Sequence, residues 1–397
     1  MIVSNRIKNL HPYVPGEQPK DRVYIKLNAN ENPYKPSPKV CKDVIDFVQN
    51  SPEKLGLYPD PDSNKLHQKI ADMLNASGGV LCRAKVDENN NVTPAEIDKI
   101  PFTVTSDMIY SGNGSDEVLS FVFYAFFDSS KKFVMPQFTY SFYPVYAGFY
   151  NIPMDCIPLL PDWKLDVETM LSHAKQNDGG IIFANPNAPT GISLSRAEVR
   201  QMLQKASPDQ IFIVDEAYVD FGGESCIPLL KEFKNLLIVR TFSKSLSGAG
   251  QRLGYIVANR ELINIVTTVK NSVNHFPIDA VAQVCGEAAC DDVAYYVETS
   301  KKIAYEREKF SEFLTAKGFE VLPSKTNFVF ARKNGFSGKE IYEKIREQGI
   351  LIRHFETERI KDYNRITVGS REEMESFLDA VREILGGKIW EQPKSTE

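Results

Sequence analysis

Four short β-branched or aromatic runs alternate with polar stretches of helical pattern through the middle of this chain. The runs occupy residues 132–135, 180–184, 210–214 and 236–240. Such alternation predicts a parallel sheet with crossover helices, and therefore an α/β fold. A polar cluster follows each run, at residues 136–143, 185–191, 215–218 and 241–252. Because ligands of open α/β sheets bind at the carboxyl ends of the strands, these clusters predict a shared ligand site.

The length of the chain and a change in its sequence pattern predict more than one domain. A chain of 397 residues exceeds what one hydrophobic core usually organises. After about residue 280, long charged helical stretches surround two further strand-like runs, 326–331 and 365–368, which favours a smaller α+β domain. We expect an N-terminal arm over residues 1–34, a large domain over 35–270 and a small domain over 271–397.

Residues 75–107 are less regular and are interpreted as a surface excursion. Within them, Thr93-Pro94-Ala95-Glu96 has the composition of a capped helix start.

Composition excludes several classes of protein. The net charge of -5 argues against a nucleic-acid binder, which normally carries a basic excess. The longest apolar runs, such as residues 121–127, are too short to span a bilayer, and no signal-peptide core begins the sequence. The six cysteines form no CxxC pair and no Cys/His ligand spacing. We therefore expect a cytoplasmic protein with reduced thiols, no membrane contact and no metal site.

One lysine carries the strongest chemical signal. Lys244 lies in Thr-Phe-Ser-Lys-Ser-Leu-Ser-Gly-Ala-Gly-Gln-Arg, between the hydroxyls of Ser243 and Ser245 and eight positions before Arg252. A lysine that condenses with an aldehyde cofactor needs a mobile backbone to swing away during catalysis, and the phosphate of pyridoxal phosphate needs hydroxyls and an arginine fork. This grouping predicts a pyridoxal-phosphate site. The alternative is a solvated lysine that follows a strand.

Gly114-Ser115-Asp116, at the start of an apolar helical stretch, predicts a seat for that phosphate. Free N–H groups and the positive end of a helix hold anions, although an ordinary Ser/Asp helix cap has the same local sequence.

Two segments resemble nucleotide-binding motifs but do not match them fully. Residues 111–117 resemble a dinucleotide loop, but Glu117 stands where a small residue must pack. Residues 213–216 resemble the magnesium strand of an ATPase, but the chain has no GxxxxGK[ST] loop.

Ordered blocks along nearly the whole chain resemble the fold-type I pyridoxal-phosphate aminotransferases, and among them most closely the histidinol-phosphate aminotransferases. The blocks are residues 27–33, 58–61, 112–117, 139–141, 185–191, 215–218, 241–252 and 365–369. The resemblance implies a large domain with a mostly parallel seven-stranded sheet flanked by helices, and a smaller α+β C-terminal domain.

The same resemblance implies the roles of the residues around the cofactor ring. Lys244 would bind the cofactor covalently and later move the proton between the substrate's α-carbon and the cofactor. Asp215 would pair with the pyridine nitrogen and keep it protonated, so that the ring accepts electrons. Tyr218 would donate to the phenolic oxygen O3′, and Tyr140 would stack on the ring. Either tyrosine could instead belong to the core.

The phosphate group and the subunit arrangement are implied in the same way. Ser115, Asp116, Ser243 and Arg252 would surround the phosphate, and Tyr58 would reach in from a second subunit. The protein would therefore be a homodimer.

One position departs from the pattern of the family. Most relatives have an asparagine that donates to O3′ immediately before Pro-Thr-Gly, and this chain has Ala188 there, preceded by Asn187. Either Asn187 shifts to bind the cofactor, or Tyr218 acts alone. We expect the second arrangement.

Tyr13, Arg353 and Arg365 would line the substrate pocket. The resemblance implies two amino donors, glutamate and histidinol phosphate, so the enzyme would interconvert histidinol phosphate and 2-oxoglutarate with imidazole-acetol phosphate and glutamate in histidine biosynthesis. Arg365 could bind either anion, and Arg353 with Tyr13 would add donors for the larger phosphate.

Other functions remain open at this point. A decarboxylase of threonine phosphate shares nearly every cofactor residue, and an aromatic or broad-range aminotransferase could use the same pocket. A transcriptional regulator with this fold would need a DNA-binding extension, for which residues 1–26 leave little room.

Overall fold

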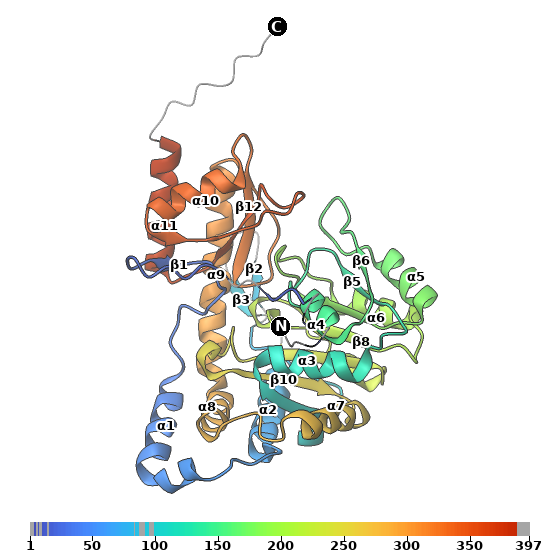
Figure 1. The fold of residues 1–397 in the computed structure, drawn as a ribbon. Helices are drawn as coiled ribbons and strands as arrows, with labels where there is room; N and C mark the ends of the chain where they lie inside the picture. The colour runs from blue at the N-terminus through green and yellow to red at the C-terminus, as the bar shows by residue number, and fades with distance from the viewer. Residues whose placement is uncertain are drawn as a thin grey trace.

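The computed structural model describes residues 4, 7, 10–13, 16–82, 84–86, 92–94 and 99–386. Within them, a seven-stranded sheet in the order β4-β10-β9-β8-β7-β5-β6 forms the centre of the larger part (Figure 1). Its strands are β4 (Ile109–Asn113), β5 (Phe133–Pro136), β6 (Met154–Ile157), β7 (Ile181–Ala184), β8 (Phe212–Asp215), β9 (Leu236–Thr241) and β10 (Leu253–Ala258). Only β10 runs antiparallel to its two neighbours; the other pairs are parallel. The expected α/β fold with a mostly parallel sheet is confirmed.

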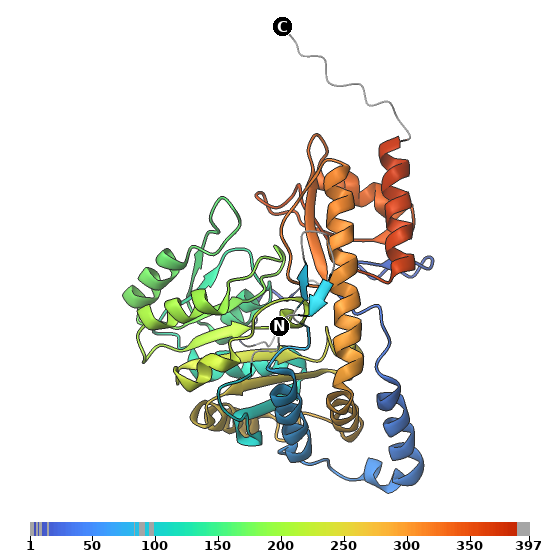
Figure 2. The same ribbon diagram turned by 180° about the vertical axis from the view of Figure 1, so that it is seen from behind.

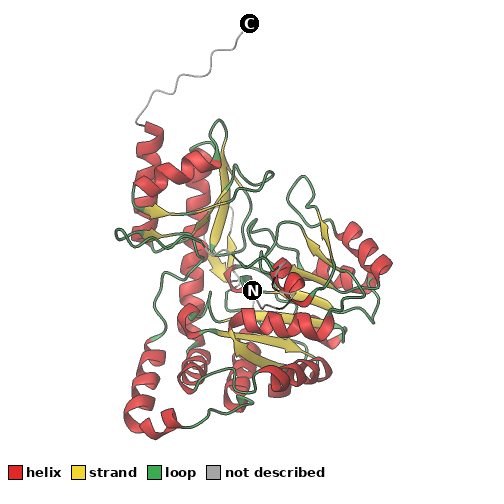
Figure 3. Ribbon diagram, viewed as in Figure 1, coloured by secondary structure: helices red, strands yellow, loops and turns green. Residues whose placement is uncertain are grey.

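Both faces of this sheet are covered by helices (Figure 3). Neighbouring residues of a strand point to opposite faces, so Phe212 and Val214 join one hydrophobic cluster while Ile213 joins the other. The surrounding helices are α2 (Asn64–Ser77), α3 (Gly114–Phe126), α4 (Tyr143–Tyr150), α5 (Val167–Asn177), α6 (Arg196–Lys205) and α7 (Arg260–Val273). Strands buried on both faces read as continuous apolar runs, which explains the pattern of the sequence.

A second, antiparallel sheet in the order β11-β12-β15-β14 forms the smaller part. It has a hydrophobic cluster of its own. Its strands and helices are β11 (Phe319–Val321), β12 (Phe328–Lys333), β14 (Arg353–His354), β15 (Asn364–Thr367), α10 (Gly338–Glu347) and α11 (Arg371–Gly386). The long helix α9 (Val293–Ala316) runs from the larger part to this one (Figure 2).

The N-terminal segment is bound to both parts. Strand β1 (Ile25–Lys26) pairs in parallel with β13 (Ile350–Leu351) of the smaller part. Further on, α1 (Pro38–Asn50) packs against α8 (Ala280–Asp291), and α8 also packs against α2. The expected limits of the arm and of the two domains stay a prediction. None of the described helices is long and apolar enough to cross a membrane.

Two local expectations were wrong. The strand expected at residue 326 begins at Phe328, because Thr326 O accepts from Arg307 of α9 and the Asn327 amide donates to the N-terminal segment at Asn30 O. Residues 92–94 form strand β3, which pairs with β2 (Ala84–Val86), so the helix start expected at Thr93 is wrong there. Ala95 and Glu96 lie outside the described residues.

Candidate active site

Two adjacent cavities open where the parallel strands end. The inner cavity, of about 310 Å³, is lined by residues that follow β7, β8 and β9 and by the start of α3. The outer cavity, of about 480 Å³, extends from there toward the smaller part and the N-terminal segment. Residues that line both are Ala29, Tyr140, Ala188, Tyr218 and Lys244. The expectation that the polar clusters meet at the carboxyl ends of the strands is confirmed.

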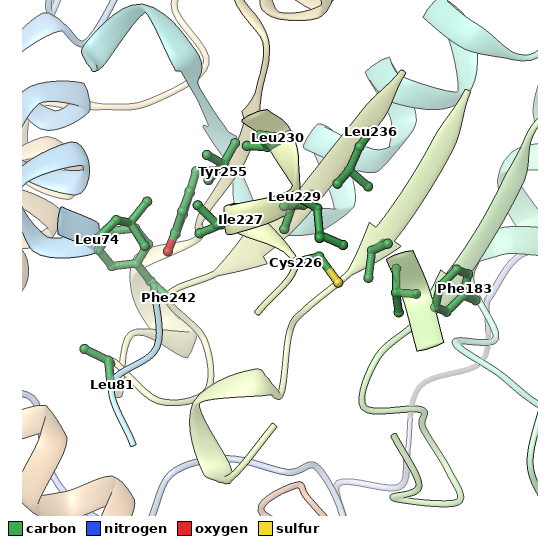
Figure 4. Packing of buried hydrophobic residues seen from close by; sticks show 14 of the residues in the cluster. Leu74, Leu81, Phe183, Cys226, Ile227, Leu229, Leu230, Leu236, Phe242 and Tyr255 are labelled. Atoms are coloured by element: carbon green, nitrogen blue, oxygen red, sulfur yellow. The ribbon is translucent and has the colours of Figure 1, made fainter. Parts of the chain in front are cut away.

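Lys244 lies on a short loop held firmly by its neighbours. Phe242 is fully buried in the core (Figure 4), its N–H donates to Leu253 O at 3.0 Å, and its carbonyl accepts from Gly248 N at 2.9 Å. The Lys244 ammonium makes a longer hydrogen bond, 3.3 Å, to Ala29 O. The mobile backbone expected at this lysine is therefore not found, and the weakly bound amine leaves the side chain as the part that can move.

Asp215 ends strand β8 in the inner cavity and is 4% exposed. Its carboxylate accepts hydrogen bonds from the Tyr143 hydroxyl at 2.8 Å and from Ala217 N at 3.1 Å. Burial raises the pKa of Asp215 to about 6, although both hydrogen bonds act in the opposite direction. A desolvated carboxylate without a cationic side chain is suited to a ligand that brings a positive N–H group.

The start of α3, which also lines the inner cavity, is suited to an anion. Helix α3 begins at Gly114, and its preceding residue, Asn113, makes no side-chain cap. Gly114 has a φ of 77°, and a Cβ there would lie 2.5 Å from Nη2 of Arg252, so only glycine lets the guanidinium approach the helix start. The hydroxyl-bearing residues Ser115 and Ser243 line the same cavity. Helix N–H groups, a guanidinium and hydroxyls are the groups to which a phosphate binds.

Asp116 organises this part of the cavity through its carboxylate. It accepts from Arg252 Nη2 at 3.0 Å and from the Tyr140 hydroxyl at 2.8 Å. Burial beside Asp116 raises the pKa of Tyr140, which keeps its hydroxyl protonated as a donor. The expected phosphate residues are therefore brought together, with the Asp116 side chain directed to Arg252 and Tyr140.

The outer cavity contains a half-buried arginine, Arg365, that has no acidic partner among the described residues. Arg365 donates from Nη2 to Asn28 O at 3.0 Å, while its Nε has no hydrogen-bond partner. No acidic side chain in the described ranges forms an ion pair with it, and burial lowers its pKa. Arg353, over the ring of Phe355, and Tyr13 line the same cavity. A guanidinium with a buried, unpartnered Nε and no paired carboxylate in the described part of the chain is suited to an anionic ligand.

Two expected cofactor residues do not line either cavity. Asn187 donates its amide to Phe138 O, 49 positions away, at 2.8 Å and to Thr190 Oγ1 of its own turn at 3.1 Å, so its donors are occupied by the protein. This arrangement favours the alternative in which Tyr218 acts without it. Tyr58 is 83% exposed and stacks on Phe276 with 4.6 Å between ring centroids. Its role in a second subunit stays a prediction.

Two residues of the site were not predicted from the sequence. Tyr143, which binds Asp215, stands in an aromatic-rich stretch that resembles ordinary core. Asn30, whose amide donates to the Tyr218 hydroxyl at 2.9 Å, lies in one of the matched blocks, but nothing local indicates its partner 188 positions away. The neighbour of Asp215, Glu216, is a structural residue, since its carboxylate lies 3.2 Å from Arg240 Nε in the interior.

Comparison with known proteins agrees with this geometry. The sequence matches the family described as aminotransferase class I and II over residues 22–381. It is 45% identical over 384 residues to the histidinol-phosphate aminotransferase of Syntrophus aciditrophicus, covering 96% of this chain and 98% of that protein. It is 40% identical to the enzyme of the same name from Chromohalobacter salexigens, with 96% and 98% covered. The structure of histidinol-phosphate aminotransferase from Sinorhizobium meliloti in complex with pyridoxal-5'-phosphate superposes with a TM-score of 0.80 at 21% identity, covering 97% and 98% of the two chains.

Proposed function

Because the chain belongs to the class I and II aminotransferase family, we propose that it transfers an amino group between histidinol phosphate and 2-oxoglutarate with pyridoxal phosphate as cofactor. The observation that carries this proposal is the arrangement of the inner cavity. A buried carboxylate, a lysine, and a guanidinium at the start of a helix line this one cavity, and these are the groups that the pyridine nitrogen, the aldehyde and the phosphate of the cofactor require.

The residues present fit this cofactor. When bound, pyridoxal phosphate supplies an aldehyde and an electron-accepting ring. Lys244 would hold the aldehyde carbon and, once displaced by the substrate's amine, would move a proton at the substrate's α-carbon. Asp215 would accept the N–H of the pyridine ring, and Tyr218 would donate to its phenolic oxygen. Arg252 and the start of α3 would bind the phosphate, with the serines beside them.

The outer cavity supports the proposed substrates. Arg365 would bind the α-carboxylate of glutamate or the phosphate group of histidinol phosphate, because both lie beside the reacting carbon. Arg353 and Tyr13 line the part of the cavity closest to the N-terminal segment, where they would add donors to the larger phosphate.

A half-reaction on the loaded protein tests the function. Histidinol phosphate, glutamate, threonine phosphate and phenylalanine are added separately while the visible absorbance of the bound cofactor is followed. We expect histidinol phosphate and glutamate to convert the cofactor to its amine form, with phenylalanine much slower. Release of carbon dioxide from threonine phosphate would identify a decarboxylase, and a fast reaction with phenylalanine would identify an aromatic aminotransferase. Failure to bind pyridoxal phosphate would contradict the proposal as a whole.

Replacing Arg353 by alanine is expected to separate the two substrates. A lost charge-assisted hydrogen bond to the phosphate should lower kcat/KM for histidinol phosphate by roughly 30-fold, and for glutamate by only about threefold. Steady-state kinetics with each substrate measures both values. Arg371→Ala serves as a control, since Arg371 is exposed and pairs with Glu375 outside the site. Equal losses with both substrates in Arg353→Ala would mean that Arg353 only supports the pocket.

We also propose a homodimer in which Tyr58 reaches the inner cavity of the partner. Tyr58 is 83% exposed beside two other exposed apolar side chains, Leu55 and Leu57. Exposed apolar groups gathered on one segment favour contact with another protein surface. Sedimentation equilibrium measures the mass of the assembly, and a monomer at micromolar concentration would contradict this proposal.

A further inference from the structure

Asn30 occupies a strained and fully enclosed position beside the site. It is 1% exposed and has a φ of 55°, a conformation that asparagine tolerates better than most residues. Its N–H donates to Thr367 Oγ1 at 3.0 Å, and its carbonyl accepts from Asn327 Nδ2 at 3.0 Å. Its backbone is therefore bound on both sides to the smaller part of the protein.

The neighbouring hydrogen bonds determine which way the Asn30 amide points. Because Thr367 Oγ1 accepts from the Asn30 N–H, its own proton is available to the Asn30 Oδ1, which lies 3.1 Å away. The amide nitrogen is thereby turned to Tyr218, whose hydroxyl oxygen lies 2.9 Å from Nδ2. An amide nitrogen only donates, so the Tyr218 oxygen must be the acceptor in this bond.

The direction of this bond decides what the Tyr218 proton can do. A phenol that accepts from Asn30 keeps its own proton for another acceptor, and Tyr218 lines both cavities. Position 188 offers no competing amide, because Ala188 carries only a methyl group toward them. Hydrogen bonds in a chain polarise one another, so the donation from Asn30 makes the Tyr218 hydroxyl a stronger donor.

We propose that Asn30 is a positioning residue that commits Tyr218 to donate its proton into the inner cavity, onto the phenolic oxygen of the cofactor. The inference rests on the proposed function. It also connects the chemistry to the substrate site, because Thr367 lies on β15, two positions after Arg365. The chain of donors runs from Thr367 through Asn30 to Tyr218.

The test measures the pH midpoint of the visible absorbance of the bound cofactor in Asn30→Gly. Glycine accepts the positive φ, so the substitution removes the amide without straining the backbone. A phenolic oxygen with a weaker donor holds the neighbouring proton on the Lys244 nitrogen more strongly. We expect the midpoint to rise by about half a pH unit, and by more in Tyr218→Phe. Thr367→Val, which frees the amide to turn, should shift it in the same direction and serves if the glycine variant does not fold.

The double variant separates positioning from a general structural effect. In the Tyr218→Phe background, Asn30→Gly should change the midpoint by less than about 0.2 units, since the bond on which it acts is already absent. Additive shifts, or an unchanged midpoint in both Asn30→Gly and Thr367→Val, would overturn the inference. A parent protein without a cofactor absorbance would instead overturn the proposed function, so the two failures are distinguishable.

Discussion

Lys244→Ala is expected to abolish transamination, with kcat reduced by about four orders of magnitude or more. The reason is that one amine has two tasks, covalent attachment of the cofactor and transfer of the α-proton, and Lys244 is the lysine that lines both cavities in the described part of the chain. The variant should still bind pyridoxal phosphate, because Asp215, Arg252 and the start of α3 are unchanged. Single-turnover kinetics and the visible absorbance spectrum measure the two effects.

The control for this variant is Lys339→Ala, which removes an exposed lysine far along the chain from the site. It should leave both the spectrum and the rate unchanged. Reduction of the parent protein with borohydride, followed by peptide mass analysis, should place the cofactor on the peptide that contains Lys244. A label on another lysine, or a Lys244→Ala variant with more than about a tenth of the parent activity, would refute the assignment.

The part of the site that follows the parallel strands could be predicted from the sequence. The ends of β8 and β9 carry Asp215 and the loop of Lys244, and a parallel sheet brings such ends to one edge whatever the details of packing. Each of these residues therefore had a local signal, an apolar run followed at once by a polar group.

The remainder depends on contacts between distant segments. The bond of Tyr143 to Asp215 joins residues 72 positions apart, and the bond of Asn30 to Tyr218 joins residues 188 apart. The positions of Tyr143 and Asn30 in the sequence do not indicate their partners, because the topology of the whole fold decides how far apart in the chain two packed elements lie. The antiparallel direction of β10 has the same origin. The loop at residues 242–252 returns the chain along β9, and the sequence of β10 resembles that of the parallel strands.

Asp215→Asn is expected to have opposite effects on activity and on the stability of the unloaded protein. An amide cannot keep the pyridine nitrogen protonated, so kcat should fall by about two to three orders of magnitude. The same change removes a buried carboxylate whose ionisation lowers the free energy of unfolding. Because the pKa of Asp215 is raised from 3.8 to about 6, the unloaded variant should gain up to about 3 kcal/mol in its free energy of unfolding at pH 7 to 8.

The sign of the pH dependence distinguishes this cause from a general change in packing. A carboxyl group whose pKa is raised in the folded state weakens stability as the pH rises from about 4 to 6, and the full penalty remains above that range. The stability gained by Asp215→Asn should therefore be small near pH 4 and reach its plateau above pH 6. Urea unfolding of the unloaded parent and variant at pH 4, 5, 6 and 8 measures the difference. Asp209→Asn, at an exposed position, should show no such rise. A difference in the free energy of unfolding between parent and Asp215→Asn that stays constant at all four pH values would show that burial does not raise the pKa of Asp215. It would then remove the physical reason for assigning Asp215 to the cationic ring nitrogen.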